Sequence, residues 1–208
     1  TGFDERISAG EVEQILQDRS PAFRVRWLRG ERPEHPRWRG TVYGTYRDGV
    51  WEKTEPMGDP VDVPAGGTVA YEILAEPTGT RSLFSLGAPV QVQSDDHTIR
   101  VTPLYTLEAT RAVQKRISYR VVSAVPDTLP AGAAPSGFLS VPAELEMRLS
   151  GLAGDLRRET TEDTVRAVAT HLRENHTYDP APGAAEDREP VVRFLFETRR
   201  GHCEYFAS

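Results

Sequence analysis

The hydrophobic pattern of the chain changes at one point, and this change limits the folds that the chain can adopt. From Phe23 to about Val125, apolar residues come in short runs, mostly at alternate positions, with Gly, Pro and Asp between the runs. Such alternation is typical of β-strands. After a segment rich in Pro, Ala and Gly at residues 130–142, apolar residues recur at helical spacing. The sequence therefore predicts a strand-rich part followed by a helical part.

Short strands are predicted throughout the first part. They are Phe23 to Trp27, Trp38 to Tyr46, Val50 to Lys53, Val69 to Ala75, Leu83 to Leu86, Val90 to Val92, Ile99 to Val101 and Ile117 to Val125. Asp48-Gly49 is a hairpin turn signal. Strands of this number and length suggest a β-sandwich. The tryptophans Trp27, Trp38 and Trp51 are expected in its core, with a carbohydrate-stacking platform as the alternative.

The second part is predicted to be mainly helical, which makes the fold class α+β. Helices are expected from Ala143 to about Gly151 and from Thr160 to Asn175, the latter capped by Thr160 or Thr161. One face of the second helix carries Val165, Val168, Ala169 and Leu172. The domain prediction is a β-sandwich-like domain at 1–129 with a short helix from Ser8, a linker at 130–142, and a second domain at 143–208.

Composition excludes several function classes. The net charge of −6 and the pI near 5.5 argue against nucleic acid as the partner, because phosphate binding needs a basic surface. No stretch reaches the roughly 20 apolar residues that span a bilayer. A single cysteine leaves too few thiolates for a cysteine-based zinc site. We therefore expect no metal and no cofactor.

The only cysteine, Cys203, follows Gly201-His202 close to the last residue of the sequence. It could be a buried apolar thiol, an exposed surface thiol or a catalytic one. The segment Pro190 to Gly201 is predicted to be a helix with Arg199 and Arg200 in its last turn. If a new helix begins after it, the thiol lies at that helix's N-terminus, where backbone N–H groups favour a thiolate.

A family resemblance favours the catalytic alternative. Residues 194–208, FLFETRRGHCEYFAS, resemble the nucleophile segment of bacterial transglutaminase-like proteins, whose papain-type core uses a Cys-His-Asp triad. Residues 160–178, followed by Asp179-Pro180, resemble the helix and Asn-x-Thr-Tyr segment of that family. Residues 23–26, 38–40, 46–51 and 71–78 resemble the extracytoplasmic β domain that precedes this core in membrane-anchored members.

The resemblance implies a role for one residue, Cys203, as the nucleophile. In the family the His and Asp partners lie downstream of the Cys, so this chain is expected to be inactive and its second domain incomplete. Residues 204–208 are expected to be poorly ordered or covered by the β domain or another chain. His202, His171 and His176 are expected to be solvated or packing histidines, with the last two on different faces of a helix.

Two functions are compatible with these features. The first is a thiol acyltransferase or cysteine peptidase that attacks protein or peptide amides and forms a thioester acyl-enzyme. The resemblance places such an enzyme outside the cytoplasm, as the extracytoplasmic region of a membrane-anchored protein. The second is a non-catalytic module for binding or assembly in the cell envelope, with a degenerate transglutaminase-like scaffold.

Overall fold

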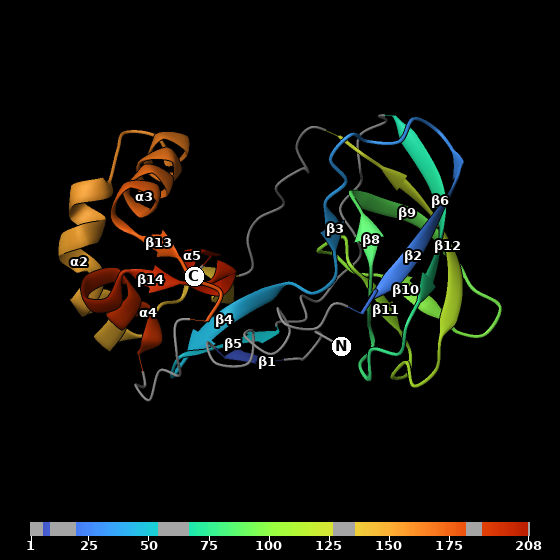
Figure 1. Ribbon diagram of the computed structural model, residues 1–208, viewed down its shortest axis with the longest axis horizontal. Helices are drawn as coiled ribbons and strands as arrows, with labels where there is room; N and C mark the ends of the chain where they lie inside the picture. Colours follow the sequence, from blue (N-terminus) through green and yellow to red (C-terminus); the bar gives the residue numbers. More distant parts are fainter. Residues whose placement is uncertain (1–5, 9–19, 54–66, 127–135, 182–188, 208) are drawn as a thin grey trace. The chain divides into compact units, whose positions relative to one another are not determined.

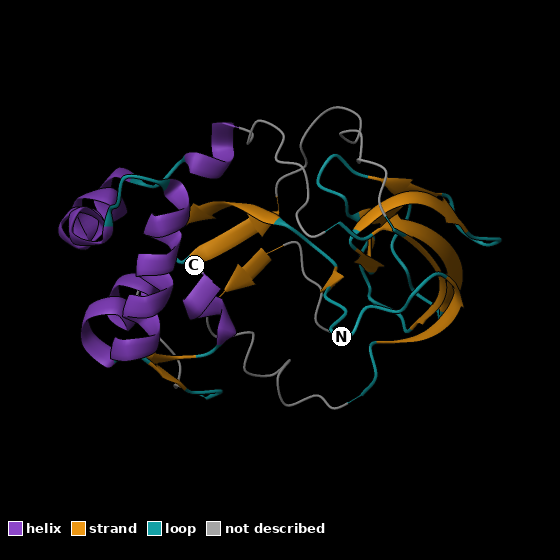
Figure 2. Cartoon of the chain, turned by 90° about the horizontal axis from the view of Figure 1, so that it is seen from above, coloured by secondary structure: helices purple, strands orange, loops and turns teal. Residues whose placement is uncertain are grey.

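The computed structural model describes residues 6–8, 20–53, 67–126, 136–181 and 189–207 (Figure 1). Contacts divide these residues into two compact units. The first contains described residues within 20–44 and 53–138, and the second contains residues 6–8, 45–52 and those described within 139–207. Figure 2 shows that the first unit consists mainly of strands and loops, whereas the helices gather in the second. The α+β fold class is confirmed.

The first unit is built around an antiparallel sheet in the order β2-β6-β12-β9. These strands are β2 (Phe23–Arg29), β6 (Thr68–Ala75), β12 (Ile117–Ala124) and β9 (Ala88–Gln93). The other strands of the unit are β10 (Ile99–Val101), β11 (Leu107–Ala109) and β7 (Ser82–Leu83), which form one sheet, and β3 (Trp38–Arg39) with β8 (Ser85–Leu86). Buried and half-buried residues alternate along β6, because one face of the sheet covers the core.

The core of the first unit is centred on Tyr71, which is fully buried. Trp27 and Trp38 pack on its ring with centroid distances of 5.8 and 5.4 Å. Its hydroxyl lies 2.9 Å from Ser123 Oγ and accepts a hydrogen bond from the backbone N–H of Leu86 at 2.7 Å. The buried hydroxyl is therefore satisfied, and the expectation that these two tryptophans are core residues is confirmed.

A hairpin contributes to the second unit. Its strands β4 (Tyr43–Arg47) and β5 (Val50–Lys53) pair with each other, and β5 also pairs with β1 (Arg6–Ser8). The positive φ angles of Asp48 and Gly49, 51° and 78°, confirm the predicted turn. The helix expected from Ser8 falls on residues 9–19, which lie outside the described residues.

The side chains of this hairpin help to form the core of the second unit. Tyr46 packs with Leu145, Val191 and Val192, and Trp51 packs against this cluster. Contacts therefore assign residues 45–52 to the helical unit although their sequence pattern is that of a hairpin.

Two long helices lie in the second unit, as predicted. The first, α2 (Ala143–Leu156), is longer than expected, and the second, α3 (Thr161–Asn175), begins at its cap Thr160. The apolar face of α3 is largely open to solvent: the exposed fractions of Val165 and Val168 are 62% and 38%. None of the helices in the described part of the chain is long and apolar enough to cross a membrane.

The cap of α3 gives a stability prediction. Thr160 Oγ1 accepts a hydrogen bond from the backbone N–H of Asp163 at 3.1 Å. We expect Thr160→Ala to lower the free energy of unfolding of the second unit by about 1 kcal/mol, because an orphan N–H loses its acceptor. Urea unfolding followed by circular dichroism measures the change. Thr161→Ala, one residue into the helix, is the control, and an equal loss in both variants would show that the cap does not act.

The segment before the cysteine departs from the predicted helix. It begins as α4 (Pro190–Arg193) and continues as a π-helical turn, η2 (Phe194–Thr198), closed by a hydrogen bond from Arg199 N–H to Phe194 O of 3.0 Å. The prediction that Arg199 and Arg200 lie in the last helical turn is wrong. Arg199 ends the helix in the left-handed conformation, with φ 52°, and Arg200 begins a strand. The inserted residue of a π turn shifts the end of the helix.

Candidate active site

Cys203 is the first residue of a short helix, α5 (Cys203–Ala207), and its thiol is exposed. The residues before it form β14 (Arg200–Gly201), which pairs in parallel with β13 (Thr177–Tyr178). Hydrogen bonds of 2.8 Å run from Thr177 N–H to Arg199 O and from Asp179 N–H to Gly201 O. This ladder fixes the backbone that leads into the cysteine helix.

An ion pair also connects β14 to the residue that follows β13. The Asp179 carboxylate lies 3.0 Å from the Arg200 guanidinium. Its other oxygen accepts the backbone N–H of Ala181 at 3.0 Å. The sequence analysis did not predict this strand pair, because strands of two residues are too short to show a period-2 pattern.

Gly201 allows the chain to turn tightly into α5. A Cβ atom on this residue would lie 2.7 Å from Cδ2 of Tyr205 and 2.9 Å from its Cβ. Tyr205 is buried, and its ring packs on the buried ring of Phe194 with a centroid distance of 5.3 Å. A side chain at position 201 would therefore collide with Tyr205, so only glycine fits there.

Residues 204–207, which were expected to be poorly ordered or covered by another part of the protein, lie in the helix α5. Phe206 contacts the rings of Phe194 at 5.1 Å and Tyr178 at 6.3 Å within the second unit. Phe194 itself is only 1% exposed. Ser208 lies outside the described residues. Aromatic contacts thus hold a helix that is too short to be stable alone.

The histidines near the cysteine are packing residues. His202 is fully buried with its ring 4.9 Å from that of Tyr205. The expectation that His171 and His176 face apart is wrong: His176 follows the end of α3, and their rings are 5.6 Å apart. Within the described residues, no histidine ring hydrogen-bonds to the sulfur of Cys203.

Burial keeps two groups beside the cysteine uncharged. It raises the pKa of the Tyr205 hydroxyl, and the Glu204 carboxylate adds to this effect. It lowers the pKa of His176. Both side chains are therefore neutral near pH 7 and act by packing.

Among the residues that the structure describes, no three His, Cys, Asp or Glu side chains come together as metal ligands. The chemistry that this arrangement offers is that of a positioned, exposed thiol.

Comparison with known proteins identifies the family. The TgpA N-terminal domain family matches residues 1–130. The chain belongs to this family. The transglutaminase-like superfamily matches residues 150–208, which contain α3, the strand pair and Cys203. The suspected relationship to bacterial transglutaminase-like proteins is thereby confirmed.

Solved structures agree with the family assignment. The crystal structure of the periplasmic domain of TgpA from Pseudomonas aeruginosa matches with a TM-score of 0.81 and 24% sequence identity, covering 99% of this chain and 73% of that one. The same domain bound to ethylmercury matches with a TM-score of 0.81, 25% identity, and coverages of 99% and 75%. No curated protein matches the chain. The predicted extracytoplasmic location is confirmed, because the chain belongs to the TgpA N-terminal domain family and the matching domain of TgpA is periplasmic.

Proposed function

We propose that Cys203 is the nucleophile of a thiol acyltransferase or cysteine peptidase that acts on protein or peptide amides outside the cytoplasm. The observation that supports this most is the exposed thiol at the start of α5, held by the β13–β14 ladder within the segment that matches the transglutaminase-like superfamily. An exposed thiol on a fixed backbone can meet a carbonyl carbon in a defined orientation.

The reaction proceeds in two steps. The thiolate of Cys203 attacks the amide carbonyl, the carbon–nitrogen bond breaks, and the amine leaves with a proton, which gives a thioester. Water or a second amine then attacks the thioester and releases the thiolate. The first step needs a base that removes the thiol proton.

Residues 1–208 by themselves are proposed to be inactive. His171, His176 and His202 are packed among other side chains, and none hydrogen-bonds to the sulfur within the described residues. Without a base, only a small fraction of a thiol is ionised at neutral pH. Turnover by these residues alone would show that the base lies among them.

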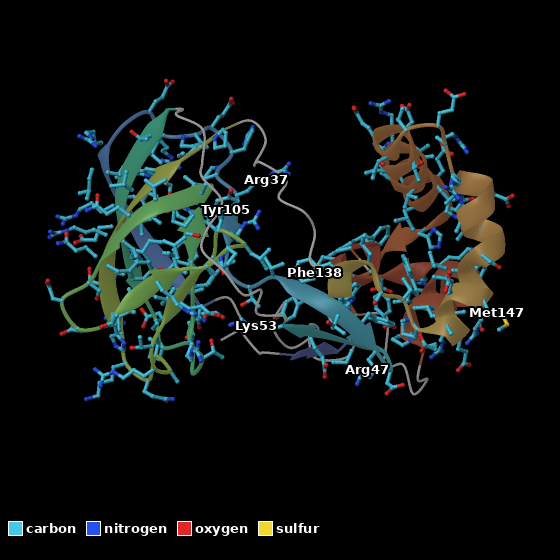
Figure 3. The ribbon with its side chains drawn as sticks, turned by 180° about the vertical axis from the view of Figure 1, so that it is seen from behind. Arg37, Arg47, Lys53, Tyr105, Phe138 and Met147 are labelled. Carbon is cyan, nitrogen blue, oxygen red and sulfur yellow. The ribbon has the colours of Figure 1, made fainter. Side chains whose placement is uncertain are left out.

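Amine incorporation by the natural full-length protein tests the proposal. We expect Cys203→Ala to lower the activity at least about 1,000-fold, because the substitution removes the thiol that forms the acyl-enzyme. Met147→Leu is a matched control, since Met147 is 76% exposed and its side chain projects from α2 (Figure 3). Unchanged activity in Cys203→Ala would contradict the proposal, whereas absence of activity in the wild-type protein would favour a non-catalytic envelope module instead.

A further inference from the structure

His176 lies between helix α3 and strand β13, and β13 pairs with the strand that leads into the cysteine helix α5. It follows α3 directly, and its backbone N–H donates to Leu172 O at 3.0 Å. The next residue, Thr177, begins β13, which pairs with the strand that leads to Cys203. The side chain of His176 is thus tied to the backbone that positions the thiol.

The ring of His176 packs among aromatic side chains and is only 8% exposed as a residue. Its centroid lies 4.6 Å from that of Phe194 and 6.5 Å from that of Phe206, which belongs to the cysteine helix. Its Nε2 lies 3.3 Å from Leu195 O. A carbonyl only accepts, so Nε2 carries the proton and the neutral ring has its lone pair on Nδ1.

A second proton would have to go on Nδ1, where the lining of the adjoining cavity offers no carboxylate to receive it. This atom is buried and has no hydrogen-bond partner among the described residues. The ring borders a cavity of about 180 Å³ whose other lining residues are Leu152, His171, Asn175, Leu195, Phe196 and Arg199. These residues include no carboxylate.

The charges that face His176 also oppose its protonation. Burial lowers its pKa most, the Leu195 carbonyl and, to a smaller extent, the backbone of His171 act in the opposite direction, and the charges of His171 on α3 and Arg199 after η2 lower it further. The folded pKa therefore lies below the unfolded value. Its contribution to stability is present above the ordinary histidine pKa of about 6.5 and is lost as the pH falls through the folded value.

We propose that His176 is a positioning residue for Cys203, which holds the cysteine helix while its ring is neutral and releases it when the ring is protonated. The imidazolium is drawn toward water in the adjoining cavity, so Phe194 and Phe206 lose one of the rings that pack against them and α5 shifts. Acid would then switch off the nucleophile without changing the thiol itself. The catalytic consequence rests on the proposed function, whereas the movement of α5 does not.

The amide NMR signals of Gly201 and Phe206 in residues 1–208 test the movement without a substrate. Between about pH 7.5 and pH 4.5, both signals should follow one transition with its midpoint below the ordinary histidine value. His176→Gln keeps a donor for Leu195 O but cannot titrate, so its signals should stay flat. His171→Gln removes one neighbouring charge and should keep the transition, moved to higher pH.

These measurements test the positioning role of His176 and the catalytic role of Cys203 separately. A wild-type profile without a transition, or the same transition in His176→Gln, would overturn the positioning role whatever Cys203 does. In the natural protein, His176→Gln should retain about threefold more of its neutral-pH kcat/KM at about pH 5.5 than the wild type retains. A shared NMR transition together with an active Cys203→Ala variant would instead overturn the proposed function and leave the switch in place.

Discussion

Gly201→Ala is expected to displace the cysteine helix. The new Cβ would lie within 2.9 Å of the Cβ and Cγ atoms of Tyr205, which are close to the backbone of α5 and cannot swing aside. Tyr205 cannot retreat either, because it is buried against Phe194. We expect the second unit to lose about 1–3 kcal/mol of unfolding free energy, the usual cost of overpacking.

A larger effect is expected on catalysis than on folding. A displacement of about 1 Å at the nucleophile lowers the rate about 100-fold, so kcat/KM of the natural protein should fall by that factor. Urea unfolding of residues 1–208 and kcat/KM of the natural protein measure the two losses.

The matched control is Gly154→Ala in α2, where nothing lies within 4 Å of the added Cβ. Alanine favours a helix by about 0.5–1 kcal/mol over glycine, so this variant should be as stable as the wild type or more stable. Wild-type stability and activity in Gly201→Ala would contradict the close approach of Gly201 and Tyr205.

Glu108→Gln should cause the largest loss of stability in the first unit. The Glu108 side chain is only 2% exposed, and its carboxylate pairs with Lys53, with Arg81 at 3.1 Å and with Arg100 at 2.6 Å. A neutral amide would remove the negative charge that these cations share, and the Lys53 side chain is only 11% exposed. We expect a loss of about 3 kcal/mol, because breaking a buried ion pair on one side leaves an uncompensated charge.

The unfolding free energy of the first unit should depend on pH because of the same carboxylate. Burial acts to raise the pKa of Glu108, but hydrogen bonds and charges from Lys53 and Arg100 outweigh it and hold the pKa below its usual range. Its contribution is therefore present above the unfolded pKa of about 4.3 and is lost as the pH falls through the folded value.

Urea unfolding at several pH values compares Glu108→Gln with Glu76→Gln. Glu76 also binds two arginines, Arg24 at 3.0 Å and Arg116 at 2.8 Å, but on the surface of the sheet. It should matter far less, because solvent screens exposed pairs. Equal losses in the two variants would contradict a special role for the buried cluster.

The sequence predicted those strands whose pattern reflects one buried face. In β6 and β12, apolar residues alternate because one side of the sheet covers the core. The strand β11 was missed, because it has three residues and the central one, Glu108, is a residue type expected at the surface. Its burial depends on Arg100 of the neighbouring strand β10 and on Lys53, which is distant in the sequence.

The candidate site was predicted only where a motif carries it. Cys203 was predicted as a nucleophile from the segment around it, and the structure places this residue at the surface. The turn at Arg199 was not found, because Arg-Arg-Gly has the composition of an ordinary helix end. The burial of His176 was not found either, because its aromatic neighbours Phe194 and Phe206 come from later segments of the chain.

Mass spectrometry of the natural protein, trapped during turnover and then digested with a protease, tests the role of Cys203 most directly. With a glutamine-containing peptide as the amide, the account predicts an added acyl mass on the proteolytic fragment that contains Cys203, together with loss of ammonia. Hydroxylamine should remove this mass, because it cleaves thioesters. An adduct that persists in Cys203→Ala, or turnover without any adduct on that fragment, would contradict the account.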